Sequence, residues 1–390
     1  MAVGSVIGMT LTIGLTLTIG LTLAIGLTLA LGACGPAAEP RASAPPPTGF
    51  QAPALAWVPV SVPQIAGGSL AAVAGDDRGF VAVGSVAGPD GPAVRALVMT
   101  SADGLEWVVP DVSGIERVSL ADVAVGPPGF VAVGQRDLGP NALTTFLAFS
   151  ADGRTWQTPV LPEPAQQSFV FRVGWAGDRY LAIGTDLGGG PVPFELTSPD
   201  GRTWTSTTRD FQRRVIETDG GWRGIGPMTT WSTIDGEPVE AGAVPPDEDG
   251  RVAYEAESGV VTGSGTLLVG TVDVPCGAFV KICGLRSAAW SSEDGTSWRA
   301  LPRGDPGWPS VQSSMLTAVD DGKLVIYDDG KLSVSDDGWR WQPLVPGRMQ
   351  RPDGSSGSDI AAAGDRVVVA GQTFRADGAL VPWIAAAVSP

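Results

Sequence analysis

The sequence predicts an all-β protein, a seven-bladed β-propeller built from four-stranded blades. Three observations lead to this prediction. A turn motif, Ser-x-Asp-Gly-x-x-Trp, recurs at intervals of roughly 47 residues. A short apolar segment recurs with the same period. Finally, the last repeat stops before its fourth strand, whereas the domain begins with a strand that has no other partner.

The turn motif marks one hairpin in each repeat. Asp-Gly pairs favour tight hairpins because Gly accepts positive φ, and Ser and Asp side chains can bond turn amides. A degenerate copy, in which Val239 replaces the tryptophan, fills the double-length gap between Trp204 and Trp298. We therefore expect structural roles for the aspartates and tryptophans of these motifs, which are Asp103, Trp107, Asp152, Trp156, Asp200, Trp204, Asp235, Asp294, Trp298, Asp337 and Trp341.

Each repeat also contains the four strands of a blade. The second strand is the recurring apolar segment, as in residues 79–84, 129–134 and 179–184, where we expect it to end at a glycine. An apolar stretch before it, as at 70–73, reads as the first strand, and one after it, as at 96–99, as the third. The residues that follow each tryptophan complete the blade as its fourth strand.

The two ends of the domain complement each other. Residues 383–388 read as the third strand of the last blade, and the chain then ends. Residues 56–60 resemble the segment that follows Trp107, which is a fourth strand. We therefore predict that the N-terminal strand completes the last blade, which would protect both sheet edges. The alternative is a six-bladed ring, in which the repeat around Val239 is absorbed into a neighbouring blade.

The N-terminal segment predicts export. Residues 1–33 are apolar and uncharged, and they end in Leu31-Gly-Ala followed by Cys34. This ending resembles the bacterial lipobox, although no basic residue precedes the apolar run. The resemblance implies a signal peptide at 1–33, acylation of Cys34, and an anchor in the cell membrane. Residues 34–54 then form a Pro/Ala-rich tether to a domain at 55–390. The alternative is an uncleaved transmembrane helix, which also places the domain outside the cytoplasm.

The composition excludes several kinds of chemistry. The chain contains no histidine, which rules out Ser-His-Asp and Cys-His catalysis and His-ligated zinc. Its formal net charge of −16 repels phosphates and anionic headgroups. We therefore expect no nucleic-acid partner, membrane contact through the lipid anchor only, and a monomer without cofactor or metal.

The remaining cysteines, Cys276 and Cys283, lie in one long insertion, residues 272–286. In an oxidising compartment we expect them to form a disulfide that closes this loop. A site in which two thiolates bind a metal is the weaker alternative. A closed loop on a rigid scaffold can serve as a recognition element, and the alternative is a stabilised insertion without that role.

The turn motif resembles a shortened Asp-box, the BNR repeat of sialidases, sortilin-type receptors and many bacterial surface propellers. This resemblance implies a β-propeller whose motif aspartates are structural. It also implies ligand binding at the mouth of a central channel lined by first strands. Four charged residues stand out in the first-strand segments, and they are our candidates for ligand binding: Asp122, Arg172, Glu217 and Asp359. The alternative is that they are solvated groups that line the channel or pair with a neighbouring blade.

The sequence favours a binding or scaffold module for a protein or glycan over an enzyme. A sialidase-like activity is the alternative, because that family carries an active-site arginine in a Phe/Tyr-Arg-Ile-Pro motif and a tyrosine nucleophile. The segment from Phe171 to Gly174 resembles the motif but lacks its proline, and no tyrosine is visibly placed as a nucleophile. Another exo-glycosidase, which needs only two carboxylates, is also possible.

Overall fold

The chain divides into two units, Met1–Gly49 and Phe50–Pro390. The computed structural model describes residues 55–88, 91–139 and 142–208 with short interruptions, mainly strand segments between 215 and 335, and residues 341–389. The signal peptide, the tether and Cys34 lie outside the described residues. So do Cys276 and Cys283, together with the turn-motif aspartates Asp235, Asp294 and Asp337.

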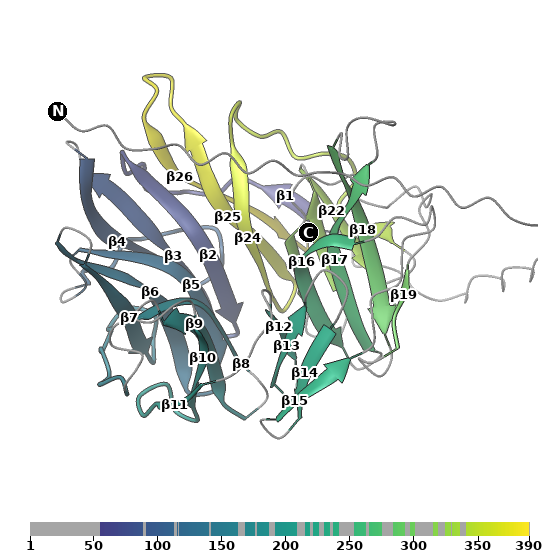
Figure 1. Ribbon diagram of the computed structural model, residues 1–390. Coiled ribbons are helices and arrows are strands. Elements are labelled where there is room, and N and C mark those ends of the chain that lie inside the picture. The colour runs from purple at the N-terminus through teal and green to yellow at the C-terminus, as the bar shows by residue number, and fades with distance from the viewer. Residues whose placement is uncertain are drawn as a thin grey trace, which may run out of the picture. The chain divides into compact units, whose positions relative to one another are not determined.

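The described residues are all-β and form seven antiparallel sheets (Figure 1). In the first half of the chain the strands are β2 (Gly68–Asp76), β3 (Gly79–Gly88), β4 (Gly91–Ser101), β5 (Val118–Gly126), β6 (Gly129–Gly139), β7 (Ala142–Ser150), β8 (Ser168–Trp175), β9 (Tyr180–Asp186), β10 (Val192–Ser198) and β11 (Thr205–Thr208). They form the sheets β2-β3-β4, β5-β6-β7 and β11-β10-β9-β8.

The second half of the chain supplies three further sheets of consecutive strands. Their strands are β12 (Val215–Thr218), β13 (Gly221–Ile225), β14 (Thr230–Ile234), β15 (Glu237–Ala241), β16 (Ala253–Thr262), β17 (Gly265–Val274), β18 (Gly284–Ser292), β19 (Arg299–Ala300), β20 (Met315–Ala318), β21 (Leu324–Asp328), β22 (Lys331–Ser335) and β23 (Gln342–Pro343). The repeat around Val239 therefore forms a sheet of its own, β12-β13-β14-β15.

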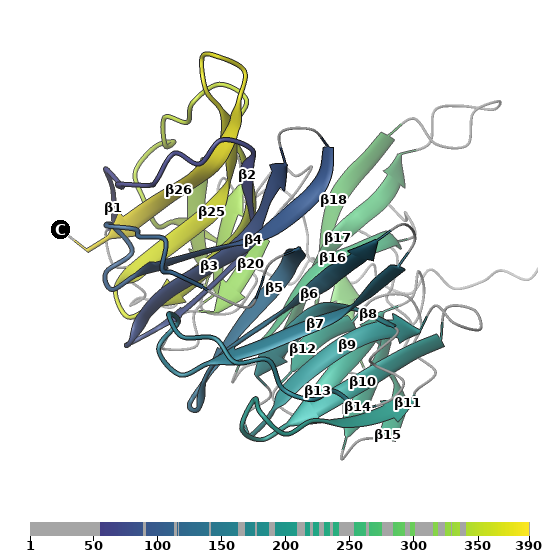
Figure 2. The same ribbon diagram turned by 90° about the vertical axis from the view of Figure 1, so that its left-hand side faces the viewer.

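The last sheet joins the two ends of the domain. It contains β24 (Ser356–Ala363), β25 (Arg366–Phe374), β26 (Leu380–Val388) and the N-terminal strand β1 (Ala56–Val58), in the order β1-β26-β25-β24. In β1, Ala56 lies opposite Val388 and Trp57 opposite Ala387, and both views show β1 beside β26 (Figures 1 and 2). The prediction that the N-terminal strand completes the last blade is confirmed.

The first two sheets lack the fourth strand that the repeat predicts. After Trp107 the chain pairs with β4 only at Val108, and after Trp156 it pairs with β7 only at Gln157. Both segments then reach a proline, Pro110 or Pro159, within two residues. Proline has no N–H to donate to a sheet, so the pairing of these two segments does not extend past it. In the sixth sheet, β23 pairs at Gln342 and Pro343.

Hydrophobic cores lie between neighbouring sheets. Phe80 and Trp107 of the first repeat pack with Val368 of the last sheet, and Val83 packs with Phe130 and Phe146 of the second. First strands pack in the order β8, β5, β2, β24, β20, β16 and β12. Among the described residues, β8 and β12 share no comparably extended contact, so a closed seven-bladed ring stays a prediction.

The turn motif makes the same hydrogen bonds in its first three copies. In the second copy, Asp152 Oδ1 accepts bonds from the amides of Arg154 and Thr155, at 2.9 and 2.8 Å, and from the Ser150 hydroxyl at 3.0 Å. Trp156 Nε1 donates to the Gly153 carbonyl at 3.1 Å. Gly153 has φ 72°, a conformation that favours glycine.

Asp152→Ala should lower the free energy of unfolding by about 1 kcal/mol, and with it the thermal midpoint. The turn amides lose the carboxylate that accepts their hydrogen bonds and must bond to water instead. These hydrogen bonds, led by the Thr155 amide, lower the pKa of Asp152. The contribution is therefore present at pH 7 and is lost as the pH falls below the ordinary range of an aspartate. Thermal unfolding at pH 7 and pH 3 measures it. Replacing exposed Asp111 is the control, and equal midpoints for the two variants at pH 7 would contradict the prediction.

A β-bulge interrupts the pairing of first and second strands in five sheets. In the second sheet it falls between Leu120 and Asp122, and Gly134 lies opposite Leu120. A Cβ on Gly134 would lie 2.0 Å from the backbone oxygen of Ser119. In these five sheets the glycine expected to end the second strand therefore lies inside it, as in β6, which continues to Gly139. The bulge is what requires the glycine.

Candidate functional site

Three of the four charged candidates occupy equivalent positions on first strands. Asp122, Arg172 and Asp359 each follow directly after the β-bulge of their strand, in β5, β8 and β24. Glu217 does not share this register. It pairs with Trp222, the second residue of β13, whereas Asp122 pairs with Val133, the fifth residue of β6. The backbone therefore places Glu217 further along its first strand, although it had been grouped with the other three.

The two aspartates join neighbouring sheets. Asp122 Oδ1 accepts a hydrogen bond from the amide of Val123 in its own strand, and Oδ2 accepts one from the amide of Val173 in β8, each at 2.9 Å. Asp359 Oδ2 accepts a hydrogen bond from the amide of Val73 in β2 at 2.8 Å. Each carboxylate thus satisfies an amide on the inner edge of the next sheet, where no strand is available to pair.

Arg172 lies beside this pair of carboxylates. Its Nη1 is 4.0 Å from Asp122 Oδ2, and its side chain is 55% exposed, against 8% for the side chain of Asp122. Its guanidinium makes no hydrogen bond to another described residue. Arg172 therefore acts on Asp122 mainly through its charge. The residue before it, Phe171, is the extra residue of the bulge and forms an aromatic pair with Phe169, with ring centroids 5.7 Å apart.

The surroundings of both carboxylates disfavour ionisation. Burial raises the pKa of Asp122, while the charge of Arg172 and the two amides lower it to a smaller extent. Burial and then the negative charge of Asp122 raise the pKa of Asp359 to about 7. The pKa of Asp359 therefore lies well above the ordinary range of an aspartate.

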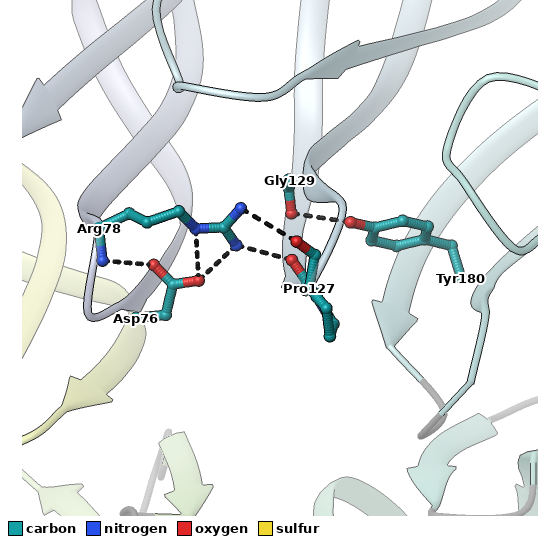
Figure 3. Close-up of polar contacts among 6 residues, drawn as sticks. Asp76, Arg78, Pro127, Gly129 and Tyr180 are labelled. Carbon is teal, nitrogen blue, oxygen red and sulfur yellow. Dashed lines mark hydrogen bonds and ion pairs between the residues drawn. The ribbon is translucent and has the colours of Figure 1, made fainter.

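A second polar network joins the first three sheets at the turns between their first and second strands (Figure 3). Arg78 forms an ion pair with Asp76 and donates from Nη2 to the Gly126 carbonyl at 2.6 Å. Tyr180 donates from its hydroxyl to the Gly129 carbonyl at 2.7 Å, and burial raises the pKa of Tyr180 to about 12. A buried phenol with a carbonyl partner is poorly suited to act as a nucleophile, so this network is structural.

The sequence did not identify the partners of these charged residues. The amides of Val73 and Val173 could not be recognised from the sequence, because every residue except proline has a backbone amide that can donate. Arg78 was not singled out either, since a lone arginine in a turn is ordinary. The spacing of Asp122 and Arg172, at the same place in consecutive repeats, was the signal that could be read.

The long insertion is shorter than residues 272–286 suggested. Residues 272–274 end β17 and residues 284–286 begin β18, and Val274 pairs with Gly284. The loop itself is therefore 275–283, outside the described residues. Within the part of the chain that is described, no helix has the length and apolarity to cross a bilayer, and no three potential metal ligands lie together.

Comparison with known proteins identifies the fold but not the family. No family model and no curated protein matches the chain. A structure of YCF48 bound to D1 peptide is similar with a TM-score of 0.53 at 16% identity, covering 85% of this chain and 97% of that one. The acylaminoacyl peptidase of Pyrococcus horikoshii gives 0.50 at 13% identity, covering 80% of this chain and 51% of the peptidase.

A sialidase of Trypanosoma rangeli is also similar, at 13% identity over 86% of this chain and 55% of the sialidase. Its TM-score of 0.41 is too low to bear on activity. At these identities the likeness concerns architecture alone. The chain is an all-β protein with the β-propeller fold.

Proposed function

We propose that the chain is a bacterial surface lipoprotein of the Asp-box type, anchored through Cys34, whose propeller is a non-catalytic binding or scaffold module for a protein or glycan. The observation that carries this proposal is the use of the first-strand carboxylates. Asp122 and Asp359 accept hydrogen bonds from main-chain amides of neighbouring sheets, which supports a scaffold role for both.

The loop at 275–283 is the proposed recognition element. It connects two paired strands, because Val274 lies opposite Gly284. Cys276 follows Val274 by two residues, and Cys283 directly precedes Gly284. A disulfide between them would close the loop at its base and reduce the entropy lost on binding. Among the similar structures, YCF48 was solved with a bound peptide, which shows that one propeller of this architecture holds a protein segment.

Binding is tested with the full chain and a variant in which residues 275–283 are replaced by a short Gly-Ser linker. The control replaces residues 375–379, the turn between β25 and β26, with the same linker. Immobilised proteins are probed against a glycan array and against surface proteins of the source cell. We expect a ligand that binds the full chain and the control but not the loop variant.

The glycosidase alternative predicts a different outcome. Turnover of fluorogenic glycosides by the full chain, abolished by both Asp122→Asn and Asp359→Asn, would contradict a purely binding role. The anchor is tested separately by metabolic labelling with a palmitate analogue. Label should be incorporated by the wild type and lost in Cys34→Ser, and a labelled Cys34→Ser variant would rule out the proposed site.

A further inference from the structure

The first strands carry an unbalanced set of charges. Their only cation is Arg172. Their acidic residues are Asp76, Asp122, Glu217, Glu255, Glu257 and Asp359. Asp76 is neutralised by Arg78 outside this set. Where Asp122, Arg172 and Asp359 act on one another, two carboxylates therefore share one guanidinium, which is itself largely exposed to water.

Asp359 lies at the contact, or joint, between the last sheet of the domain and the first. Its hydrogen bond to the Val73 amide connects β24 to β2, and β24 belongs to the sheet that holds both ends of the domain. The bond therefore links the chain-closing sheet to the first sheet of the domain. The equivalent position in β2 is Ala72, whose side chain cannot accept a hydrogen bond from the next sheet.

The charged groups around Asp359 come from few elements. Asp122 on β5 and Arg172 on β8 act on it from neighbouring sheets. Of the strands that pack on β24, β20 has no titratable residue and β2 has only Asp76, which is bonded to Arg78. On β25, Arg366 has its ion-pair partner in Asp365, 3.9 Å away. Among the described residues, Arg172 is the one cation that acts on a charge at Asp359.

We propose that the joint between β24 and β2 is proton-linked: protonated Asp359 holds it closed, and loss of that proton loosens it. A neutral carboxyl still offers an oxygen to the Val73 amide, and it removes the repulsion from Asp122. The ionised carboxylate keeps the hydrogen bond but is only partly exposed to water, and it experiences the negative charge of Asp122. This inference concerns the scaffold and holds whatever the propeller binds.

The direction of the pH effect follows from proton linkage. The pKa of Asp359 is raised in the closed joint, to about 7, and returns toward that of an ordinary aspartate when the joint opens to water. Opening therefore releases a proton and becomes more favourable as the pH rises through this range. Between pH 6 and pH 8 the opening equilibrium should increase about tenfold.

Hydrogen–deuterium exchange of the full chain tests this at the peptide that contains Val73. After correction for intrinsic rates, exchange should be about tenfold faster at pH 8 than at pH 6. Asp359→Asn should remove this dependence. Asp377→Asn, the same change at an exposed turn of the same sheet, should retain it. Equal pH dependence in the wild type and Asp359→Asn would overturn the proposal.

A second measurement needs no substitution in the scaffold. With ¹³C-labelled aspartate, the Asp359 carboxyl resonance of the wild-type chain should titrate near neutral pH. Asp122→Asn should move that midpoint downward, because it removes the neighbouring negative charge. A wild-type midpoint below pH 5 would contradict a proton-linked joint even if the exchange data were ambiguous.

Discussion

Gly134→Ala should prevent the chain from folding, or destabilise it by about 4 kcal/mol or more. The added Cβ would lie 2.0 Å from the Ser119 oxygen and 2.8 Å from Leu120 Cα. Both are backbone atoms held by the pairing of β5 with β6, so neither can rotate away as a side chain would. Soluble yield and thermal unfolding measure the effect.

The matched control is Gly347→Ala. Gly347 has φ 80°, and an added Cβ there would meet no atom within 4 Å. That substitution should cost only the strain of a left-handed conformation, about 1–2 kcal/mol. If Gly134→Ala unfolds at the same temperature as wild type, the close approach of the two strands at the bulge is wrong.

Asp122→Ala should destabilise the protein by about 3 kcal/mol, because the amides of Val123 and Val173 both lose their acceptor in a buried place. Asp122→Asn keeps one acceptor oxygen and removes a charge that burial disfavours, but its NH2 group faces the second amide as another donor. It should therefore cost less than Asp122→Ala, which removes both acceptors. Chemical denaturation of both variants provides the comparison.

The test is which of these two variants loses more stability. If the main role of Asp122 were an ion pair with Arg172, Asp122→Asn would be nearly as destabilising as Asp122→Ala, because both substitutions remove the charge. Arg172→Gln isolates that contribution, and we expect a change below about 1 kcal/mol because the guanidinium is mostly exposed. A larger loss in Arg172→Gln than in Asp122→Ala would contradict the bridging role.

Much of the fold could be predicted from the sequence because its repeats are regular. The period of the turn motif located the second and third strands, and the resemblance of residues 56–60 to the segment after Trp107 led to the pairing of β1 with β26. The first two sheets lack the expected fourth strand, because each segment makes a single bridge, at Val108 or Gln157, before it reaches Pro110 or Pro159. The glycines were interpreted as strand ends because a bulge has no sequence signature beyond the glycine itself.

The candidate site was only partly predictable. Charge against an apolar background identified Asp122, Arg172 and Asp359, which do share one register. Glu217 was grouped with them by its position in a repeat that has lost much of its pattern. Pairing with a neighbouring blade is one of the two interpretations that the sequence allows. Which main-chain amides donate to Asp122 and Asp359 could not be foreseen, because such contacts depend on how consecutive sheets pack.

Cysteine cross-linking of the two chain ends tests the central claim most directly. Ala56→Cys and Val388→Cys, introduced together, place thiols at directly opposite positions of β1 and β26. Mild oxidation should yield an intramolecular disulfide between residues 56 and 388 in peptide maps. The pair Ala56→Cys and Phe374→Cys, with position 374 at the far end of the neighbouring strand, should not. Absence of the first cross-link, or equal formation of both, would contradict a sheet shared by the two ends of the chain.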